Sequence, residues 1–262
     1  MKSRNLTKDA ASHARHLFIL CVILCFARAT HAADLPTTVQ SVKPSIVGIG
    51  SHEKTRSPAV KFVGTGFVVA DGLSIITNAH VANGAVSSEN EMLGIVIGKG
   101  AEMEFRQAKL VASDPEHDLA LLRISGKPLP SLQLGDSANV VEGQSVAFTG
   151  FPLGIVLGLN HATHRGIVSA ITPIVLPALG SGKLDARMIS QLRRNPFMIF
   201  QLDGTAYPGN SGSPVYDPQT GVVYGVINMV FVKGIKENAI TNPSGITYAI
   251  PGRYVRELLQ AK

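Results

Sequence analysis

Short runs of β-branched and other apolar residues recur along the chain, and Gly, Asp, Asn or Pro residues separate one run from the next. Runs spaced about 8 to 12 residues apart favour a β-sandwich or β-barrel over alternating strand–helix units. Helical patterns are confined to residues 183–194 and 252–262, so the sequence predicts an all-β fold. The predicted strands cover residues 45–50, 60–63, 66–69, 74–77, 93–97, 119–124, 145–149 and 221–227.

The N-terminal segment has the composition of a secretory signal peptide. Its eleven apolar residues at 17–27 (LFILCVILCFA) follow a basic stretch and precede the small-residue segment Thr30-His31-Ala32-Ala33. This order predicts a signal peptide over residues 1–32, with cleavage near Ala32. A retained membrane anchor and a buried helix are the alternatives, although a bilayer span requires about 18 to 20 apolar residues.

Charge and cysteine content change once this segment is set aside. Of the 24 Lys and Arg and 18 Asp and Glu residues, five and one fall within residues 1–32, which leaves 19 basic and 17 acidic residues and a net charge of +2. This balance gives no basis for a nucleic-acid partner.

Both cysteines, Cys21 and Cys25, lie in the predicted signal peptide. Export without disulfides suits the bacterial periplasm or the exterior, and no apolar run predicts stable membrane insertion.

Three separate segments each carry a side chain used in acyl transfer. His80 lies in a turn after a predicted strand, Asp118 precedes the apolar strand 119–124, and Ser211 lies in the glycine-rich turn YPGNSGSP. A serine hydroxyl needs a base within hydrogen-bond reach, and a carboxylate must hold the imidazole in the correct tautomer. The chain order His, Asp, Ser is that of chymotrypsin and differs from those of subtilisins and α/β-hydrolases. Singly, each residue suits an ordinary turn, surface or capping role, so the prediction of a catalytic triad depends on all three.

The turn around the serine also predicts an oxyanion hole formed by Gly209, Asn210 and Ser211. Glycines on both sides allow the backbone to approach closely, and the N–H groups of Gly209 and Ser211 would point into one concavity. Each such donor is worth about 3 to 4 kcal/mol in serine hydrolases.

Three other histidines lie near these segments. His161 and His164 have a spacing found in metal sites, but no carboxylate or cysteine lies at ligand spacing from them. We therefore expect both to be structural, and we expect neither a metal nor a cofactor. His117, next to Asp118, is expected to face solvent.

Around these residues the sequence resembles the HtrA/Deg branch of the chymotrypsin-like, or trypsin-like, serine proteases. The matching motifs follow the family's order from about residue 43 to residue 255, nearly all of the chain after the predicted signal peptide. They are Gly64-Thr-Gly-Phe67, Ile76-Thr-Asn-Ala-His-Val81, Asp114-Pro-x-x-Asp-Leu-Ala-Leu-Leu122, Gly166-Ile-Val-Ser-Ala170, Pro208-Gly-Asn-Ser-Gly-Ser-Pro214 and Gly245-Ile-Thr-Tyr-Ala-Ile-Pro251.

The resemblance implies a fold of two perpendicular six-stranded antiparallel β-barrels with a short C-terminal helix. The first barrel is expected at about residues 43–135, the second at about 136–250 and the helix at 252–260, all within a protease domain at 34–262. The first barrel would supply the histidine and the aspartate of the triad, and the second barrel would supply the serine.

Two departures from the family pattern affect these expectations. Ser213 stands where the family has a second Gly after the nucleophile, a change that is tolerated if the backbone at this position suits serine. The sequence stops soon after the predicted terminal helix, so we expect no PDZ domain and no regulation through peptide capture by one.

The resemblance also implies where the primary specificity pocket lies. The residue six positions before the nucleophile forms its floor and is Thr205, not Asp, so an Arg or Lys side chain would lack a counter-ion there. We expect weakly discriminated small or aliphatic residues at the cleaved position. The segment 173–195 is expected to gate the oxyanion hole. The implied pocket residues are Thr205, Ala206, Tyr207, Ile227, Asn228, Met229 and Val230.

The sequence thus predicts an exported serine endopeptidase acting on unfolded or exposed polypeptides. Ser211 is the predicted nucleophile, His80 the general base and then acid, and Asp118 the residue that orients His80. The alternative is a catalytically idle pseudo-protease that binds polypeptides, as a holdase does, in the same cleft. A lipase or esterase is disfavoured by the chain order. Monomer and homo-oligomer both remain compatible with the sequence.

Overall fold

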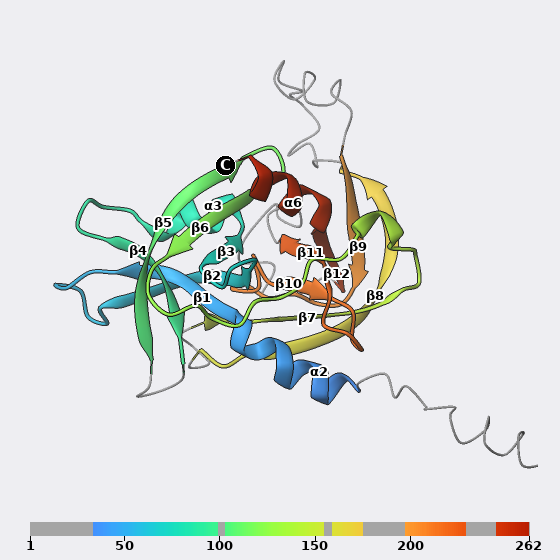
Figure 1. The fold of residues 1–262 in the computed structure, drawn as a ribbon, viewed down its shortest axis with the longest axis horizontal. Helices are drawn as coiled ribbons and strands as arrows, with labels where there is room; N and C mark the ends of the chain where they lie inside the picture. The colour runs from blue at the N-terminus through green and yellow to red at the C-terminus, as the bar shows by residue number, and fades with distance from the viewer. Residues whose placement is uncertain (1–33, 99–102, 155–158, 175–196, 229–244, 262) are drawn as a thin grey trace, which may run out of the picture. The chain divides into compact units, whose positions relative to one another are not determined.

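The computed structural model describes residues 34–98, 103–154, 159–174, 197–228 and 245–261. Two closed six-stranded antiparallel β-barrels make up the fold, which confirms the predicted fold class (Figure 1). The first, in the order β1-β2-β3-β6-β5-β4, consists of β1 (Ile46–His52), β2 (Val60–Val69), β3 (Ser74–Thr77), β4 (Met92–Ile97), β5 (Glu104–Asp114) and β6 (Leu119–Ile124). The second, in the order β10-β11-β12-β9-β8-β7, consists of β7 (Ser145–Gly150), β8 (Ala162–Pro173), β9 (Met198–Asp203), β10 (Pro214–Tyr216), β11 (Val223–Asn228) and β12 (Ile246–Pro251).

The strands β5, β8, β9, β10 and β12 were not among the strands predicted from residue patterns. The side chains of the two longest, β5 and β8, are mostly exposed or half-buried, so neither of these two strands shows a regular alternation of apolar and polar positions. Each is defined by hydrogen bonds to a neighbour on either side, β4 and β6 for β5, and β7 and β9 for β8. Barrel closure supplies both neighbours, so these strands form without an apolar pattern of their own.

The described α-helices lie around the barrels. α6 (Gly252–Gln260) is the predicted terminal helix, whereas α2 (Leu35–Val42) and α3 (Ala79–Ala85) were not predicted. α2 begins after Asp34, whose side chain accepts a backbone N–H of the first turn at 3.1 Å. Both missed helices are too short for a helical pattern to reveal them. The predicted helix at 183–194 lies outside the described residues. Within the described ranges, no helix is long and apolar enough to cross a membrane.

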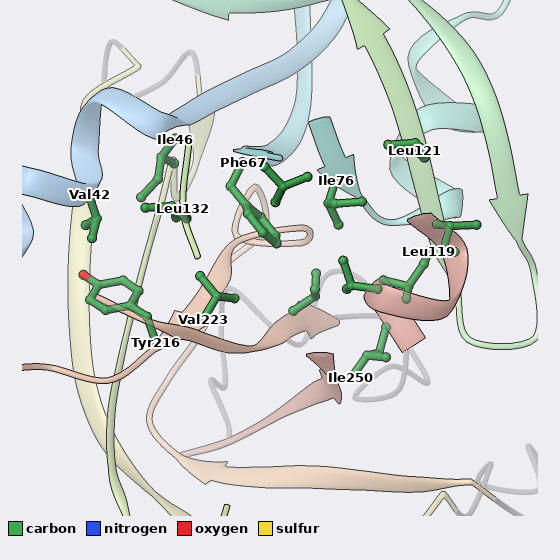
Figure 2. Close-up of a cluster of buried hydrophobic side chains, with 14 of the residues drawn as sticks. Val42, Ile46, Phe67, Ile76, Leu119, Leu121, Leu132, Tyr216, Val223 and Ile250 are labelled. Carbon is green, nitrogen blue, oxygen red and sulfur yellow. The ribbon is translucent and has the colours of Figure 1, made fainter. Parts of the chain in front are cut away.

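A hydrophobic cluster joins the two barrels (Figure 2). It contains Phe67 and Ile76 of the first barrel and Tyr216 and Ile250 of the second, all with no exposed surface. Val42 of α2 belongs to the same cluster. Two further apolar clusters draw their residues from the first and the second barrel separately. Burial of apolar surface is the main source of folded-state stability, so the shared cluster holds the barrel faces together.

Helix α6 is tied to the segment between the barrels. The backbone N–H of Arg253 donates to Ser137 Oγ at 3.0 Å, and the Arg256 guanidinium donates to the Gly135 carbonyl at 2.9 Å and to Asp136 Oδ1 at 2.8 Å. On its other side, α6 buries apolar residues in the cluster shared by the two barrels. The helix therefore connects the inter-barrel segment to the core.

Replacing Phe67 with alanine should lower the free energy of unfolding by about 3 to 5 kcal/mol, because it leaves a cavity between the barrels. Urea denaturation followed by circular dichroism measures this change. Leu110 is the control, since its side chain is 46% exposed and Leu110→Ala should change stability by only about 0.5 kcal/mol. Equal effects of the two substitutions would contradict the role given to the cluster.

Candidate active site

His80 lies in the first turn of α3, directly after β3, and not in the turn that the sequence predicted. The junction is tied to the backbone of Asp118, whose carbonyl accepts the N–H of Ala79 at 3.1 Å and the side-chain amide of Asn78 at 3.0 Å. The orientation of the helix that carries His80 therefore depends on the turn between β5 and β6.

The Asp118 carboxylate binds His80 through both of its oxygens. Oδ1 accepts the backbone N–H of His80 at 2.8 Å, and Oδ2 lies 2.6 Å from the imidazole Nδ1. An Nδ1–H that donates to a carboxylate leaves Nε2 as the acceptor nitrogen of the neutral ring. The imidazole is 34% exposed and the aspartate side chain 16% exposed, so one face of the pair is open to a substrate.

A third hydrogen bond reaches this carboxylate from the second barrel. The side-chain Nδ2 of Asn228, at the end of β11, donates to Asp118 Oδ2 at 2.8 Å, and Asn228 is fully buried. Asn228 was predicted only as a pocket wall. No sequence pattern indicates this contact, because it joins residues 110 positions apart in different barrels.

Ser211 is held by backbone contacts with the first barrel. Its carbonyl accepts the N–H of Thr65 in β2 at 2.9 Å. Gly64 lies between the two candidate segments, since a Cβ at this glycine would be 2.8 Å from Val81 Cγ1 and 3.2 Å from the Ser211 carbonyl oxygen. Val81, the residue after His80, and the backbone of Ser211 therefore both lie against Gly64 in β2.

Two glycines allow the tight turn around Ser211. Gly209 has φ of +100° and Gly212 has φ of +87°, a region that residues with a side chain rarely adopt. A Cβ would also lie 2.3 Å from the Phe151 carbonyl oxygen at position 209 and 2.0 Å from the Thr65 carbonyl oxygen at position 212. Both positions therefore exclude any larger residue.

The backbone donors of this turn differ in their partners. The N–H of Asn210 donates to the Tyr207 carbonyl at 2.9 Å, which closes the turn. The N–H groups of Gly209 and Ser211 donate to no acceptor in the part of the chain that the structure describes. Among the described residues these two donors therefore have no protein partner, whereas the N–H of Asn210 is already bonded.

Ser213 fits the position where the family pattern has glycine. It is not among the described non-glycine residues with positive φ, so its backbone conformation is an ordinary one. Its backbone N–H donates to the Asn210 carbonyl at 2.9 Å, and its carbonyl accepts the N–H of Ile227 at 2.9 Å. The side-chain hydroxyl is buried and has no hydrogen-bond partner among the described residues.

The predicted pocket residues fall into two groups within the described ranges. Ala206 and Ile227 are buried in the core of the second barrel, while Thr205 and Tyr207 are partly exposed. The backbone N–H of Ala206 donates to Thr247 Oγ1 at 3.0 Å, which anchors this segment to β12. Two more of the predicted residues, Met229 and Val230, and residues 175–195 of the predicted gate lie outside the described ranges.

The other histidines have separate surroundings. His161 Nε2 lies 3.0 Å from the Ile46 carbonyl oxygen. His164 stacks on Phe148 with ring centroids 4.8 Å apart, and burial lowers the pKa of its imidazole. The expectation that His117 faces solvent is wrong, because its side chain is only 15% exposed. Apolar contacts from distant parts of the chain cover it, which its local sequence does not indicate.

Comparison with known proteins shows the family to which this chain is similar. The family model of the trypsin-like peptidase domain matches residues 64–226. A probable periplasmic serine endoprotease DegP-like of Halomonas elongata is 32% identical over 203 residues, covering 77% of this chain and 34% of its own length. The corresponding protein of Pseudomonas putida strain W619 is 31% identical over 196 residues, covering 75% and 34%. The chain thus spans about a third of the length of these curated relatives.

Solved structures give the same fold. A structure titled HtrA-type protease AlgWS227A with tripeptide matches with a TM-score of 0.61 and 25% identity, covering 87% of this chain and 63% of its own. Another, titled HtrA-type protease AlgW with decapeptide, matches with a TM-score of 0.62 and 24% identity, covering 87% and 67%.

Replacing Asn228 with leucine should lower the free energy of unfolding by about 1.5 to 3 kcal/mol, because a carboxylate loses a buried hydrogen-bond donor. Asn228→Asp should cost more at neutral pH, since it places a like charge beside Asp118. Urea denaturation of the two variants measures both effects. A leucine variant as stable as the wild type would show that the inter-barrel hydrogen bond contributes nothing.

Proposed function

The chain belongs to the family of trypsin-like peptidase domains, and we propose on this basis that it is an exported serine endopeptidase of the HtrA/Deg type. In this proposal Ser211 is the nucleophile, His80 the general base and Asp118 the residue that orients His80. The observation that carries the proposal is the contact between His80 Nδ1 and Asp118 Oδ2, at 2.6 Å, together with a glycine-flanked turn whose Ser211 lies against the same strand position as Val81.

The proposed reaction begins with proton transfer from the serine. Asp118 holds the imidazole with Nε2 as the acceptor, so Nε2 takes the proton of Ser211 Oγ while Oγ attacks the carbonyl carbon of the scissile peptide. The carbonyl oxygen becomes an oxyanion and accepts the N–H groups of Gly209 and Ser211. Collapse of this intermediate breaks the C–N bond, and Nε2 gives its proton to the leaving amine.

Release of the second product repeats the same proton transfers. A water molecule gives one proton to the His80 imidazole and attacks the acyl carbon, and the new oxyanion uses the same two N–H groups. The protonated imidazole returns a proton to Ser211 Oγ as the ester bond breaks. The carboxylic acid product leaves, and the enzyme regains its starting state.

The proposed substrates are unfolded or exposed polypeptide segments. One matching solved structure is titled as a complex with a tripeptide, which supports a polypeptide as the bound ligand. Thr205, at the proposed floor of the pocket, carries no charge, so small or aliphatic side chains would be accepted at the cleaved position.

The proposed location is the periplasm or the exterior. The curated relatives are named as periplasmic proteins, and residues 1–32 have the pattern of a signal peptide with cleavage near Ala32. We also propose that the protease domain occupies residues 34–262, with barrels at about 43–135 and 136–250 and the helix at 252–260.

Labelling with a fluorophosphonate should modify Ser211, because the proposed base makes this hydroxyl nucleophilic. Ser211→Ala should abolish labelling and lower kcat on casein by about 10⁶-fold. Mass spectrometry of the adduct and a casein assay measure both.

The control is Ser213→Gly, which removes the neighbouring buried hydroxyl and restores the family's residue. This variant should keep both label and activity. A folded wild type without adduct or turnover would instead favour the pseudo-protease that binds polypeptides in the same cleft.

Cleavage sites in a proteome-derived peptide library should be dominated by Val, Ala or Leu at the cleaved position. Discrimination should be modest, because one methylene in an apolar pocket is worth about 1 to 3 kcal/mol. Thr205→Asp should add cleavage after Arg and Lys by supplying the missing counter-ion. A wild-type profile dominated by Arg or Lys would overturn the pocket assignment.

A further inference from the structure

His117 directly precedes Asp118 and packs against two aromatic rings from distant parts of the chain. Its imidazole stacks on Tyr254 of α6 with centroids 3.7 Å apart and planes at 18°. It meets Phe197, just before β9, edge-on at 4.6 Å and 68°. Tyr254 and Phe197 also contact each other, with centroids 5.5 Å apart. The three rings form a closed cluster that joins the β5–β6 turn to α6.

Asp114 holds the imidazole and the backbone of the same turn. His117 Nδ1 lies 2.5 Å from Oδ2 of Asp114, the last residue of β5. Oδ1 of Asp114 accepts the backbone N–H groups of Glu116 and His117, both at 3.1 Å. The imidazole is therefore clamped between its own turn and α6, and its side chain is only 15% exposed.

The residue that follows has a backbone conformation that requires support. Asp118 has φ of +52°, a left-handed conformation that is uncommon for residues with a side chain. Such a conformation persists where the surroundings impose it. The groups that are hydrogen-bonded to Asp118 itself come from the β3–α3 junction and from β11. The contacts of His117 with Asp114 and Tyr254 support the residue that precedes Asp118.

We propose that His117 is a positioning residue, which uses its stack on Tyr254 to hold Asp118 in the orientation that the contact with His80 requires. The proposal rests on the proposed function, in which Asp118 orients the general base. In this arrangement the first barrel supplies the aspartate, while the helix that follows the second barrel contributes to its orientation through His117. The hydrogen bonds of α6 to residues 135–137 anchor the helix outside the turn as well.

The test uses the full chain with active sites counted by fluorophosphonate titration. His117→Ala should lower kcat per active site by about ten- to a hundredfold, because a small misplacement of a catalytic group has effects of this size. KM should change little, since His117 has no place in the proposed substrate pocket. His117→Phe keeps a stacking ring and should restore most of the lost kcat.

A spectroscopic readout separates this proposal from the proposed function. The Nδ1 proton shared by His80 and Asp118 should give a downfield proton resonance that is shifted or lost in His117→Ala and retained in His117→Phe. The resonance can be followed in a Ser211→Ala background, which has no turnover. A wild type without turnover would refute the proposed function, and the resonance would still test the position of Asp118.

A second pair of variants approaches the stack from its other side, in case His117→Ala does not fold. Tyr254→Leu should reproduce the loss of kcat and the change in the resonance, and Tyr254→Phe should not. His52→Ala is the control, because His52 packs on Phe105 at 5.4 Å in the first barrel, away from these contacts. Folded His117→Ala or Tyr254→Leu enzymes with wild-type kcat per site and an unchanged resonance would overturn the proposal.

Discussion

The Asp118 carboxylate is the point at which hydrogen bonds from both barrels meet. One oxygen takes the backbone N–H of His80, and the other takes the His80 imidazole and the amide of Asn228. A partly buried carboxylate is stable only when hydrogen bonds replace its lost hydration. The arrangement of α3, the β5–β6 turn and β11 is therefore constrained by one carboxylate, which also contacts His80, the proposed general base.

The contact between the barrels makes this convergence possible. Phe67 and Ile76 on one side and Tyr216 and Ile250 on the other are buried in a single cluster (Figure 2). The same β2 strand that contributes Phe67 also contributes Thr65, whose N–H holds the Ser211 carbonyl. Apolar packing thus brings the barrels together. Two residues before Phe67 in β2, the backbone hydrogen bond of Thr65 holds the candidate nucleophile Ser211 against the barrel that also contributes the candidate base His80.

Much of the fold and of the candidate site could be predicted from residue patterns. The runs 74–77, 119–124 and 145–149 lie in β3, β6 and β7, because strands that are buried on both faces consist of short apolar runs bounded by turn residues. The glycines around Ser211 mark a turn that a side chain would obstruct. The strands β5 and β8 were missed because pairing on both sides, rather than an apolar face, defines them.

Local pattern and chain order sufficed for an all-β fold, the terminal helix and the choice of His80, Asp118 and Ser211 as candidates, because turn chemistry and alternation act over a few residues. The arrangement in two six-stranded barrels came from the resemblance to a known family. Contacts between distant residues required the folded chain. Asn228 beside Asp118 and Tyr254 on His117 join positions more than a hundred residues apart, and neither leaves a local signal. Such contacts arise when barrel closure and apolar burial bring whole elements together, so three-dimensional packing, rather than neighbouring residues, specifies the surroundings of the carboxylate.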